Sequence, residues 1–203
     1  MNNYVYLLDG RAYVNLTNKC HNACTFCIRN TGDGVAGTPL WLDKTPTADE
    51  VVRAFLDVRD KLVSNEVTFC GYGEPTEELA LLTECAARLK SLGCKLRLNT
   101  NGLGSLVANA DISGKLTDFD TVSVSLNDCD ARGYAEVTRS VYGLGAFPAV
   151  LDFADRCKAR GINVVFTVVD TIGSERIAAC RRLAEDMGIP LRVREYISDN
   201  YNG

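Results

Sequence analysis

Short runs of apolar residues recur along the chain and alternate with longer segments of helical periodicity. The short runs are rich in Val, Ile, Leu and Phe, as strands that are buried on both faces usually are. The segments between them place apolar residues three or four positions apart, on one stripe of a helix. This alternation predicts an α/β fold with a parallel sheet and right-handed crossovers. The predicted strands cover residues 12–16, 66–70, 95–99, 121–126, 163–169 and 191–197.

Helix boundary signals agree with this alternation. Thr47 and Glu50 have the spacing of a capping box, in which each side chain binds the other residue's backbone N–H. Pro148 suits the first position of a later helix, and Ser174 suits the N-cap of the next one. Residues 103–119 have a weaker pattern and predict a short or irregular helix. Glycine is predicted to end three helices just before a strand, at Gly93, Gly161 and Gly188.

Polar residues interrupt three of the predicted strands, always on one face. A flat sheet with helices on both sides has little use for such rows. A barrel hides one face of its sheet behind helices and can turn the other face toward a polar ligand. The pattern therefore favours a curved, partial barrel over a flat doubly wound sheet. The polar rows are Arg97 and Asn99; Ser123, Ser125 and Asn127; and Arg192, Arg194 and Tyr196.

Composition narrows the class of protein. The chain has 203 residues, of which 46% are hydrophobic and 24% charged, as expected for one globular domain. A net charge of −4 disfavours nucleic acid as the main partner, since phosphate backbones attract basic surfaces. The N-terminus has no signal-peptide pattern, and no apolar run reaches the roughly 18 residues of a membrane span. Nine cysteines without a secretion signal indicate a reducing, cytoplasmic location and thiols that are not in disulfides.

Three cysteines lie close together directly after the first predicted strand. Cys20, Cys24 and Cys27 are spaced by four and three residues, so one loop can bring their thiols to a single metal centre. Thiolates bind iron strongly, and a cubane cluster with only three of them keeps one iron open to another ligand. The alternatives are an electron-transfer cluster, core cysteines, or a zinc site, for which His21 is the only histidine. The loop follows the carboxyl end of a parallel strand, where α/β proteins bind ligands.

At this loop the sequence resembles the radical S-adenosylmethionine (SAM) superfamily, whose signature is CxxxCxΦC with an aromatic Φ, here Phe26. Residues 71–75 are similar to the superfamily's GGEP motif, and residues 99–102 to its TNG segment. Tyr72 departs from the pattern, because many members have glycine there. The resemblance extends from residue 13 to residue 196. The residues on either side of the cysteines look like those of a short family associated with TatD-type nucleases.

The resemblance implies a partial (β/α)6 barrel of the radical SAM core type, one [4Fe–4S] cluster on the three cysteines, and SAM as a cofactor. The cluster reduces SAM, and the resulting 5′-deoxyadenosyl radical removes hydrogen from an unidentified substrate, in oxidoreductase or lyase chemistry. A partner such as flavodoxin or ferredoxin supplies the electron. Residues 71–74 are expected at the SAM amino group, the aromatic residue near adenine, and fourth-strand polar residues at the ribose and carboxylate. The implied SAM contacts are Phe26, Gly71, Tyr72, Gly73, Glu74, Asn99, Ser123, Ser125 and Asn127.

The identity of the substrate is open at this point. Arg29, Arg97 and Arg194 are possible substrate contacts, because guanidinium groups inside a barrel can bind an anion. The chain is predicted to be a single radical SAM core domain over residues 1–203, without a C-terminal domain for a second cluster. The substrate is then a small molecule or part of a protein. Two alternatives are an activase for a glycyl radical enzyme and a non-catalytic sensor that binds SAM or an iron–sulfur cluster.

Overall fold

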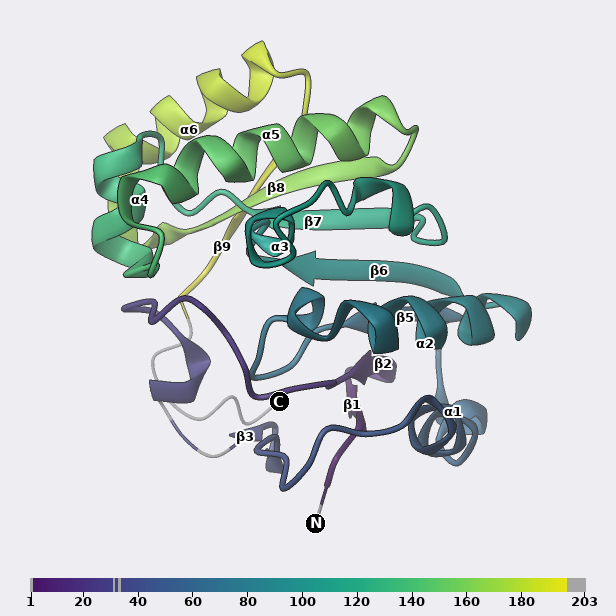
Figure 1. Cartoon of the computed structure of the whole chain (residues 1–203). Coiled ribbons are helices and arrows are strands. Elements are labelled where there is room, and N and C mark those ends of the chain that lie inside the picture. Colours follow the sequence, from purple (N-terminus) through teal and green to yellow (C-terminus); the bar gives the residue numbers. More distant parts are fainter. Residues whose placement is uncertain (1, 31, 33, 197–203) are drawn as a thin grey trace.

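One curved sheet organises the fold. The computed structural model of the protein describes residues 2–30, 32 and 34–196. Within that part of the chain, seven strands form a sheet in the order β1-β2-β5-β6-β7-β8-β9, and β1 alone is antiparallel to its neighbour (Figure 1). The strands are β1 Val5–Leu8, β2 Arg11–Val14, β5 Glu66–Phe69, β6 Lys95–Thr100, β7 Thr121–Ser125, β8 Asn163–Val169 and β9 Leu191–Arg194. A separate ribbon pairs β3 Gly34–Val35 with β4 Thr38–Pro39.

Helices connect the parallel strands. The α-helices are α1 Ala48–Leu56, α2 Leu79–Ser91, α3 Gly104–Val107, α4 Ala131–Thr138, α5 Ala146–Ala159 and α6 Ser174–Asp186. Short 3₁₀ turns are η1 Ile28–Asn30, η2 Arg59–Lys61, η3 Pro75–Glu78, η4 Ser113–Lys115, η5 Gly143–Gly145 and η6 Asp170–Ile172. Among residues 2–30, 32 and 34–196, no helix has both the length and the apolarity that crossing a bilayer requires.

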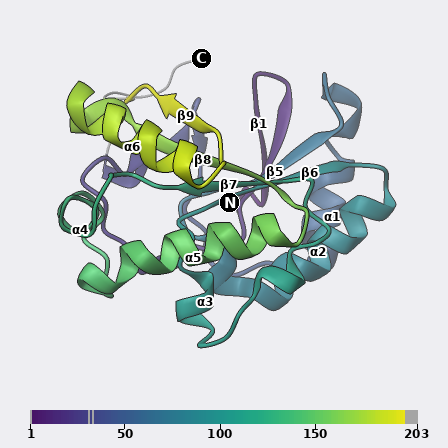
Figure 2. The same ribbon diagram turned by 90° about the horizontal axis from the view of Figure 1, so that it is seen from above.

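The two faces of the sheet differ in character. One face carries Val14, Leu98 and Phe166, which are fully buried in the same hydrophobic core as the inner residues of α1, α2, α4, α5 and α6. In the view from above, α2, α3 and α5 lie along one side of the sheet, whereas β1 and β9 rise on the other side (Figure 2). The sheet therefore curls with its helices on the convex side, as a partial barrel does and a flat doubly wound sheet does not. The predicted fold class is confirmed.

The concave face is polar, as predicted. Strand register places Asn99 opposite Ser123, and Ser125 opposite Thr167, so that these side chains point to one side. Their neighbours in sequence, such as Leu98 and Val124, are the buried apolar residues of the opposite face. Because parallel neighbours in register share a face, the polar rows of adjacent strands form one continuous wall.

Several local predictions are also confirmed. The capping box of α1 is present: the Glu50 N–H donates to Thr47 Oγ1 at 3.2 Å, and the Thr47 N–H donates to Glu50 Oε2 at 2.8 Å. The segment 103–119 contains only the short α3 and η4 within its length. The three predicted helix-ending glycines have positive φ angles, which are 84° at Gly93, 80° at Gly161 and 60° at Gly188.

The first strand, β1, was not among the predicted strands. This strand pairs with β2 through a two-residue turn in which Asp9 and Gly10 have φ angles of 50° and 70°. Positive φ at both central residues defines the hairpin turn that Asp-Gly favours. The signal was thus present in the sequence. It escaped notice because only four residues precede β1, too few for periodicity to be visible.

Two predicted helix starts are wrong, and one helix was not predicted. Helix α5 begins at Ala146, so Pro148 is its third residue, where the missing N–H also has no helical partner to lose. The N-cap of α6 is Gly173, and Ser174 is the first helical residue. Helix α4 escaped prediction because its buried face is Gly133, Tyr134 and Thr138, of which one alone is a large apolar residue. Tyr196 lies beyond the end of β9, and the predicted strand end at 197 lies outside the described residues.

Candidate functional site

The three-cysteine loop runs from the end of β2 toward the end of α4. The Ala23 N–H donates to Thr138 O at 3.0 Å, and the Thr25 N–H donates to Val137 O at 2.9 Å. These carbonyl groups belong to the last turn of α4, where no helical N–H is available to them. The loop therefore completes the hydrogen bonding of a helix end, and the helix end fixes the path of the loop.

The three thiols are free, partly buried and electrostatically coupled. None of Cys20, Cys24 and Cys27 is in a disulfide, and each is partly exposed. The pKa of Cys24 is raised to about 12, mainly by burial and in part by the nearby Cys27 and Cys20 thiols. Burial also raises the pKa of Cys20. A thiol whose pKa is raised in this way stays protonated at neutral pH unless a cation compensates the charge of the thiolate.

The segment 71–74 packs directly against this loop. A Cβ atom at Gly73 would lie 2.3 Å from Thr17 O and 2.7 Å from Lys19 O. A Cβ atom at Gly71 would lie 2.1 Å from Asn15 Oδ1. The Glu74 N–H donates to Lys19 O at 2.8 Å, which ties the two backbones together. Only glycine permits contacts this close, so the predicted motif forms one unit with the loop.

A substitution at Gly73 tests this close packing. In Gly73→Ala the new methyl group meets backbone, which cannot move out of the way as a flexible side chain can. We expect the variant to lose about 1–3 kcal/mol of unfolding free energy and to bind less iron on reconstitution. Gly145→Ala is the matched control, since Gly145 has a φ of −70° and no atom within 4 Å of the added Cβ. Equal iron content in both variants would contradict the expectation.

Glu74 is buried and links three segments. Its side-chain Oε1 accepts hydrogen bonds from Thr76 N–H at 3.1 Å, Thr76 Oγ1 at 2.8 Å and Thr100 Oγ1 at 2.7 Å. Its Oε2 accepts one from the Asn101 N–H at 2.7 Å. Burial raises the pKa of the Glu74 carboxyl group, against these hydrogen bonds, which lower it. The carboxylate thus joins η3 to the turn after β6.

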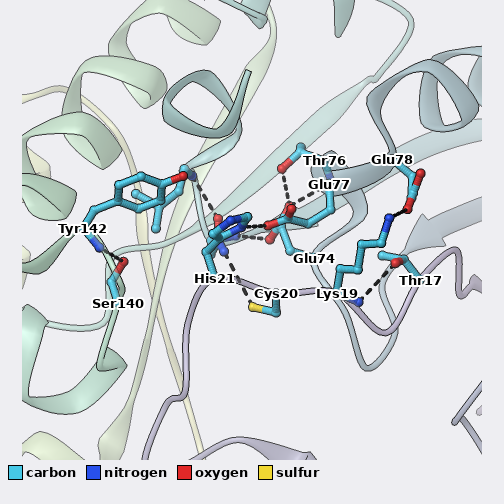
Figure 3. A network of polar contacts seen from close by, with 12 residues as sticks. Thr17, Lys19, Cys20, His21, Glu74, Thr76, Glu77, Glu78, Ser140 and Tyr142 are labelled. Carbon is cyan, nitrogen blue, oxygen red and sulfur yellow. Dashed lines mark hydrogen bonds and ion pairs between the residues drawn. The ribbon is translucent and has the colours of Figure 1, made fainter. Parts of the chain in front are cut away.

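A second set of contacts joins the cysteine loop to η3 (Figure 3). His21 Nδ1 contacts Glu77 Oε1, and the His21 ring lies 5.6 Å from the Tyr142 ring, centroid to centroid. Lys19 Nζ contacts Glu78 Oε1 at 2.8 Å nearer the surface. The sequence suggested His21 only as a possible zinc ligand, and Glu77 was not among the predicted site residues. No spacing rule could have paired residues 56 positions apart.

The amide of Asn101 reaches the loop from the turn after β6. Its Nδ2 lies 3.9 Å from Cys20 Sγ, while its Oδ1 accepts from the Leu103 N–H at 2.9 Å. Asn101 belongs to the segment that resembles the TNG motif, although the predicted contact there was Asn99. Asn99 lies two residues earlier on the concave face, where its side chain lowers the pKa of the Cys70 thiol that burial raises.

Ser123 and Ser125 lie on the concave face of β7, and Asn127 follows the carboxyl end of that strand. Within the described part of the chain, none of their side chains makes a hydrogen bond. Asn127 adopts a φ of 60° and is 4% exposed. Phe26 is half-buried in the cysteine loop. Ser125, Asn127 and the loop that carries Phe26 follow the carboxyl ends of parallel strands, as segment 71–74 does.

Tyr72 points away from that edge into a small second hydrophobic cluster. It is 3% exposed and packs with Tyr6 and Leu40. Its hydroxyl donates to Gly32 O at 2.7 Å, and its ring meets the Trp41 ring edge-on at 5.0 Å. The tyrosine therefore replaces the usual glycine without disturbing the turn, because the segment after the cysteine loop covers its side chain.

The three arginines predicted as substrate contacts lie in different places. Arg29 NH1 donates to Asn18 O at 3.2 Å, and its guanidinium lies 5.9 Å from the Trp41 ring centroid. Arg97 lies 3.8 Å from Glu66 on the concave face. Arg194 lies on β9, in register with Val169. The three arginines thus belong to three different elements, which are η1, β6 and β9.

One acidic group elsewhere resembles a metal site but is engaged by arginine. Ligand atoms of Asp128, Cys129 and Asp130 all lie within 4.8 Å of one another. Arg176 binds both carboxylates, with NH2 at 2.8 Å from Asp130 Oδ2 and Nε at 2.8 Å from Asp128 Oδ1. Because one guanidinium spans both acids, the group ties α4 to α6.

Comparisons with known proteins assign the family. The model of the Radical SAM superfamily matches residues 14–185, so this chain belongs to that superfamily and is an enzyme of the radical SAM class. A comparison with curated proteins found no match. The fold is similar to that of Streptococcus suis SuiB bound to the precursor peptide SuiA, with a TM-score of 0.68, 18% identity, and coverage of 91% of this chain and 39% of SuiB.

Other solved structures share the same fold. Native anSMEcpe with bound AdoMet has a TM-score of 0.57 at 18% identity, with 91% of this chain and 50% of that chain covered. TYW1 with a lysine-pyruvate adduct bound has a TM-score of 0.62 at 15% identity, with 93% and 65% covered. This chain thus spans less than two thirds of each of these proteins. At such identities the likeness establishes the fold and leaves the reaction open.

Proposed function

We propose that Cys20, Cys24 and Cys27 hold one [4Fe–4S] cluster with which this enzyme cleaves SAM reductively. The observation that carries the proposal is the direct packing of segment 71–74 on the cysteine loop, with Glu74 N–H 2.8 Å from Lys19 O. This contact puts backbone that can bind a small ligand beside three thiols that can bind iron. When bound, the cluster supplies the electron that splits SAM into methionine and a 5′-deoxyadenosyl radical, which removes hydrogen from the substrate.

The residues of the loop fit a cluster better than a single zinc ion. Sulfur atoms about 2.3 Å from one tetrahedral zinc lie less than about 4 Å apart. Among the described residues, the three thiols do not form a group with all ligand atoms within 4.8 Å, although Cys24 is close enough to be influenced by both others. A cubane binds each thiolate through a different iron and suits a wider spacing.

Asn22 supplies a second observation in favour of a cluster. It lies between two of the cysteines and is 5% exposed. Its side chain is close enough to the Tyr134 hydroxyl to lower that group's pKa, yet neither Oδ1 nor Nδ2 makes a hydrogen bond of good geometry in the described part of the chain. Leaving buried polar atoms unpaired is costly. The sulfide atoms of a cluster accept hydrogen bonds from amide groups and would satisfy the Nδ2 donor.

In this proposal the concave face binds SAM. Ser123, Ser125 and Asn127 offer unpaired hydroxyl and amide groups for the ribose and carboxylate, and Phe26 offers an apolar surface for adenine. The backbone of residues 71–74 holds the amino group, with Tyr72 contributing through its backbone alone. Glu74 Oε2 accepts a single hydrogen bond from the described part of the chain and so retains capacity for the ammonium group.

The reductant, the compartment and the class of substrate are proposed on the same basis. Flavodoxin or ferredoxin is the inferred reductant, and a reducing, cytoplasmic compartment keeps the free cysteines reduced. The substrate is a small molecule or part of a protein. SuiB is a precedent for the second choice, because its structure holds a precursor peptide.

Anaerobic reconstitution with iron and sulfide tests the proposal. We expect a [4Fe–4S] EPR signal on reduction, and 5′-deoxyadenosine and methionine after SAM is added. Absence of both the EPR signal and 5′-deoxyadenosine would contradict the proposal. Tight SAM binding to a reduced cluster without cleavage would instead favour the sensor.

A further inference from the structure

Every charged residue on the strands of the main sheet lies on the concave face, and most of them are cations. The entire chain has a net charge of −4, yet its main-sheet strands carry five cationic residues and one acidic residue. The pairing register of adjacent strands places all of them on the polar side. A wall lined mainly by one sign of charge attracts ligands of the opposite sign, so this wall favours an anion. The residues are Arg11, Glu66, Lys95, Arg97, Arg192 and Arg194.

Arg192 and Arg194 lie at the ligand-binding end of this wall. Arg192 pairs in register with Thr167, which pairs with Ser125, one of the residues proposed to bind SAM. Arg194 lies one step further toward the carboxyl edge, opposite Val169. Both arginines are exposed on the concave face.

The curvature of the sheet brings Arg194 close to the strands at its other end. Burial raises the pKa of the Cys70 thiol, and the positive charge of Arg194 is the strongest influence that lowers it. Arg194 acts in the same direction on Tyr13, whose pKa burial raises. Three strands separate β9 from β5 in the sheet order, so this influence acts across the concave side, toward which β1 and β9 both rise (Figure 2).

The other arginines near the site already have partners. Arg97 is close to Glu66, Arg29 binds Asn18 O, and Arg176 binds Asp128 and Asp130. By contrast, the side chains of Arg192 and Arg194 make no ion pair or hydrogen bond with the described part of the chain, although their backbones pair with β8. Asp170, which directly follows β8, accepts a hydrogen bond from the Tyr196 N–H at 2.9 Å and forms no ion pair with them in the described part of the chain.

We propose that Arg192 and Arg194 form an anion-binding subsite and that the substrate carries a carboxylate or phosphate group held there. Planar guanidinium groups bind such anions through pairs of charge-assisted hydrogen bonds. The subsite lies on the same wall as the SAM contacts, so an anchored substrate would extend across the barrel toward Tyr13 and Cys70. The inference rests on the proposed function in one respect: it takes the concave face to be the reaction chamber.

Arginine modification measures the subsite without a turnover assay. Phenylglyoxal is applied to the reconstituted protein with and without inorganic phosphate or acetate, and modified residues are located by peptide mass spectrometry. We expect phosphate, acetate or both to slow modification of Arg192 and Arg194 at least about fivefold. Arg181 and Arg182 are internal controls, because both are exposed on α6 and neither makes an ion pair in the described part of the chain. Equal slowing at the α6 arginines, or no slowing at β9, would overturn the proposal.

Two further arms separate the sources of the anion. With SAM bound first, phosphate or acetate should still slow modification at β9; if SAM alone gives full protection and neither anion adds to it, the subsite serves the SAM carboxylate and the proposal is wrong. In Arg194→Gln, about tenfold more phosphate or acetate should be needed to protect Arg192 from modification, as loss of one charge-assisted contact predicts. Arg182→Gln should leave that protection unchanged. Because this readout does not depend on 5′-deoxyadenosine, its failure is distinct from failure of the proposed function.

Discussion

Replacing Cys24 with alanine is expected to lower the formation of 5′-deoxyadenosine by more than about 100-fold. Loss of an outer partner of a metal ligand typically costs about 10- to 100-fold, and loss of a ligand itself should cost more. Iron and sulfide content after reconstitution, the EPR signal and the nucleoside yield are the measurements. We expect all three to fall together, because an incomplete set of thiolates does not retain a cubane.

Cys85→Ala is the control for this experiment. Burial raises the pKa of Cys85 to about 12, as it does for Cys24, but Cys85 lies in the core on α2. The two thiols therefore have similar pKa values and differ in their position in the fold. The control should keep its iron and lose only about 1 kcal/mol of unfolding free energy, the central value for single substitutions. If Cys24→Ala keeps its cluster as well, the assignment of the loop is wrong.

Glu74→Gln is expected to destabilise the protein by about 2–3 kcal/mol, although the two side chains have the same shape. A carboxylate accepts at both oxygens, whereas an amide must place its NH₂ at one of them. With the amide oxygen facing Thr76 and Thr100, the NH₂ group meets the N–H of Asn101, and a buried donor is left unpaired. For a chain of this size the loss corresponds to a fall in Tm of about 4–12 °C, measured by calorimetry.

Glu78→Gln controls for the removal of an acid from the same segment. Glu78 contacts Lys19 in an ion pair whose lysine is largely exposed, and such pairs contribute about 0–1 kcal/mol. We expect a Tm close to that of the unaltered protein. Similar losses in the two variants would mean that the hydrogen bonds of Glu74 are not what stabilises this edge of the sheet. Glu74→Gln should also bind SAM more weakly, since the turn at Asn101 moves.

Much of the fold could be predicted from local patterns. Hydrophobic runs with period two and stripes with period 3.6 depend only on which residues are neighbours in the chain, and they gave six strands and most of the helices. Glycine with positive φ after a helix, as at Gly161, is local as well. The cysteine spacing and the segment 71–74 were visible for the same reason, since each functional unit lies within one short loop.

Contacts between distant segments could not be predicted in this way. The carbonyl groups of Val137 and Thr138 hold the cysteine loop, yet they belong to a helix whose buried face has only one large apolar residue. Glu74 was expected at a SAM amino group, and its partners on β6 could not be foreseen from its own neighbours. From the sequence, Tyr72 was only a departure from a motif. The structure shows that its hydroxyl donates to Gly32 O.

The arginines show most plainly where sequence information ends. Alternation along β6 and β9 determined that Arg97 and Arg194 lie on the polar face of their strands. Only the tertiary structure decided that Arg97 is close to Glu66, while Arg194 remains without an acidic partner in the described residues and acts on Cys70 across the concave face. The physical reason is that side-chain direction follows from strand geometry, which is local. The charge that a side chain meets depends on how the whole sheet curves and pairs, and every strand contributes to that.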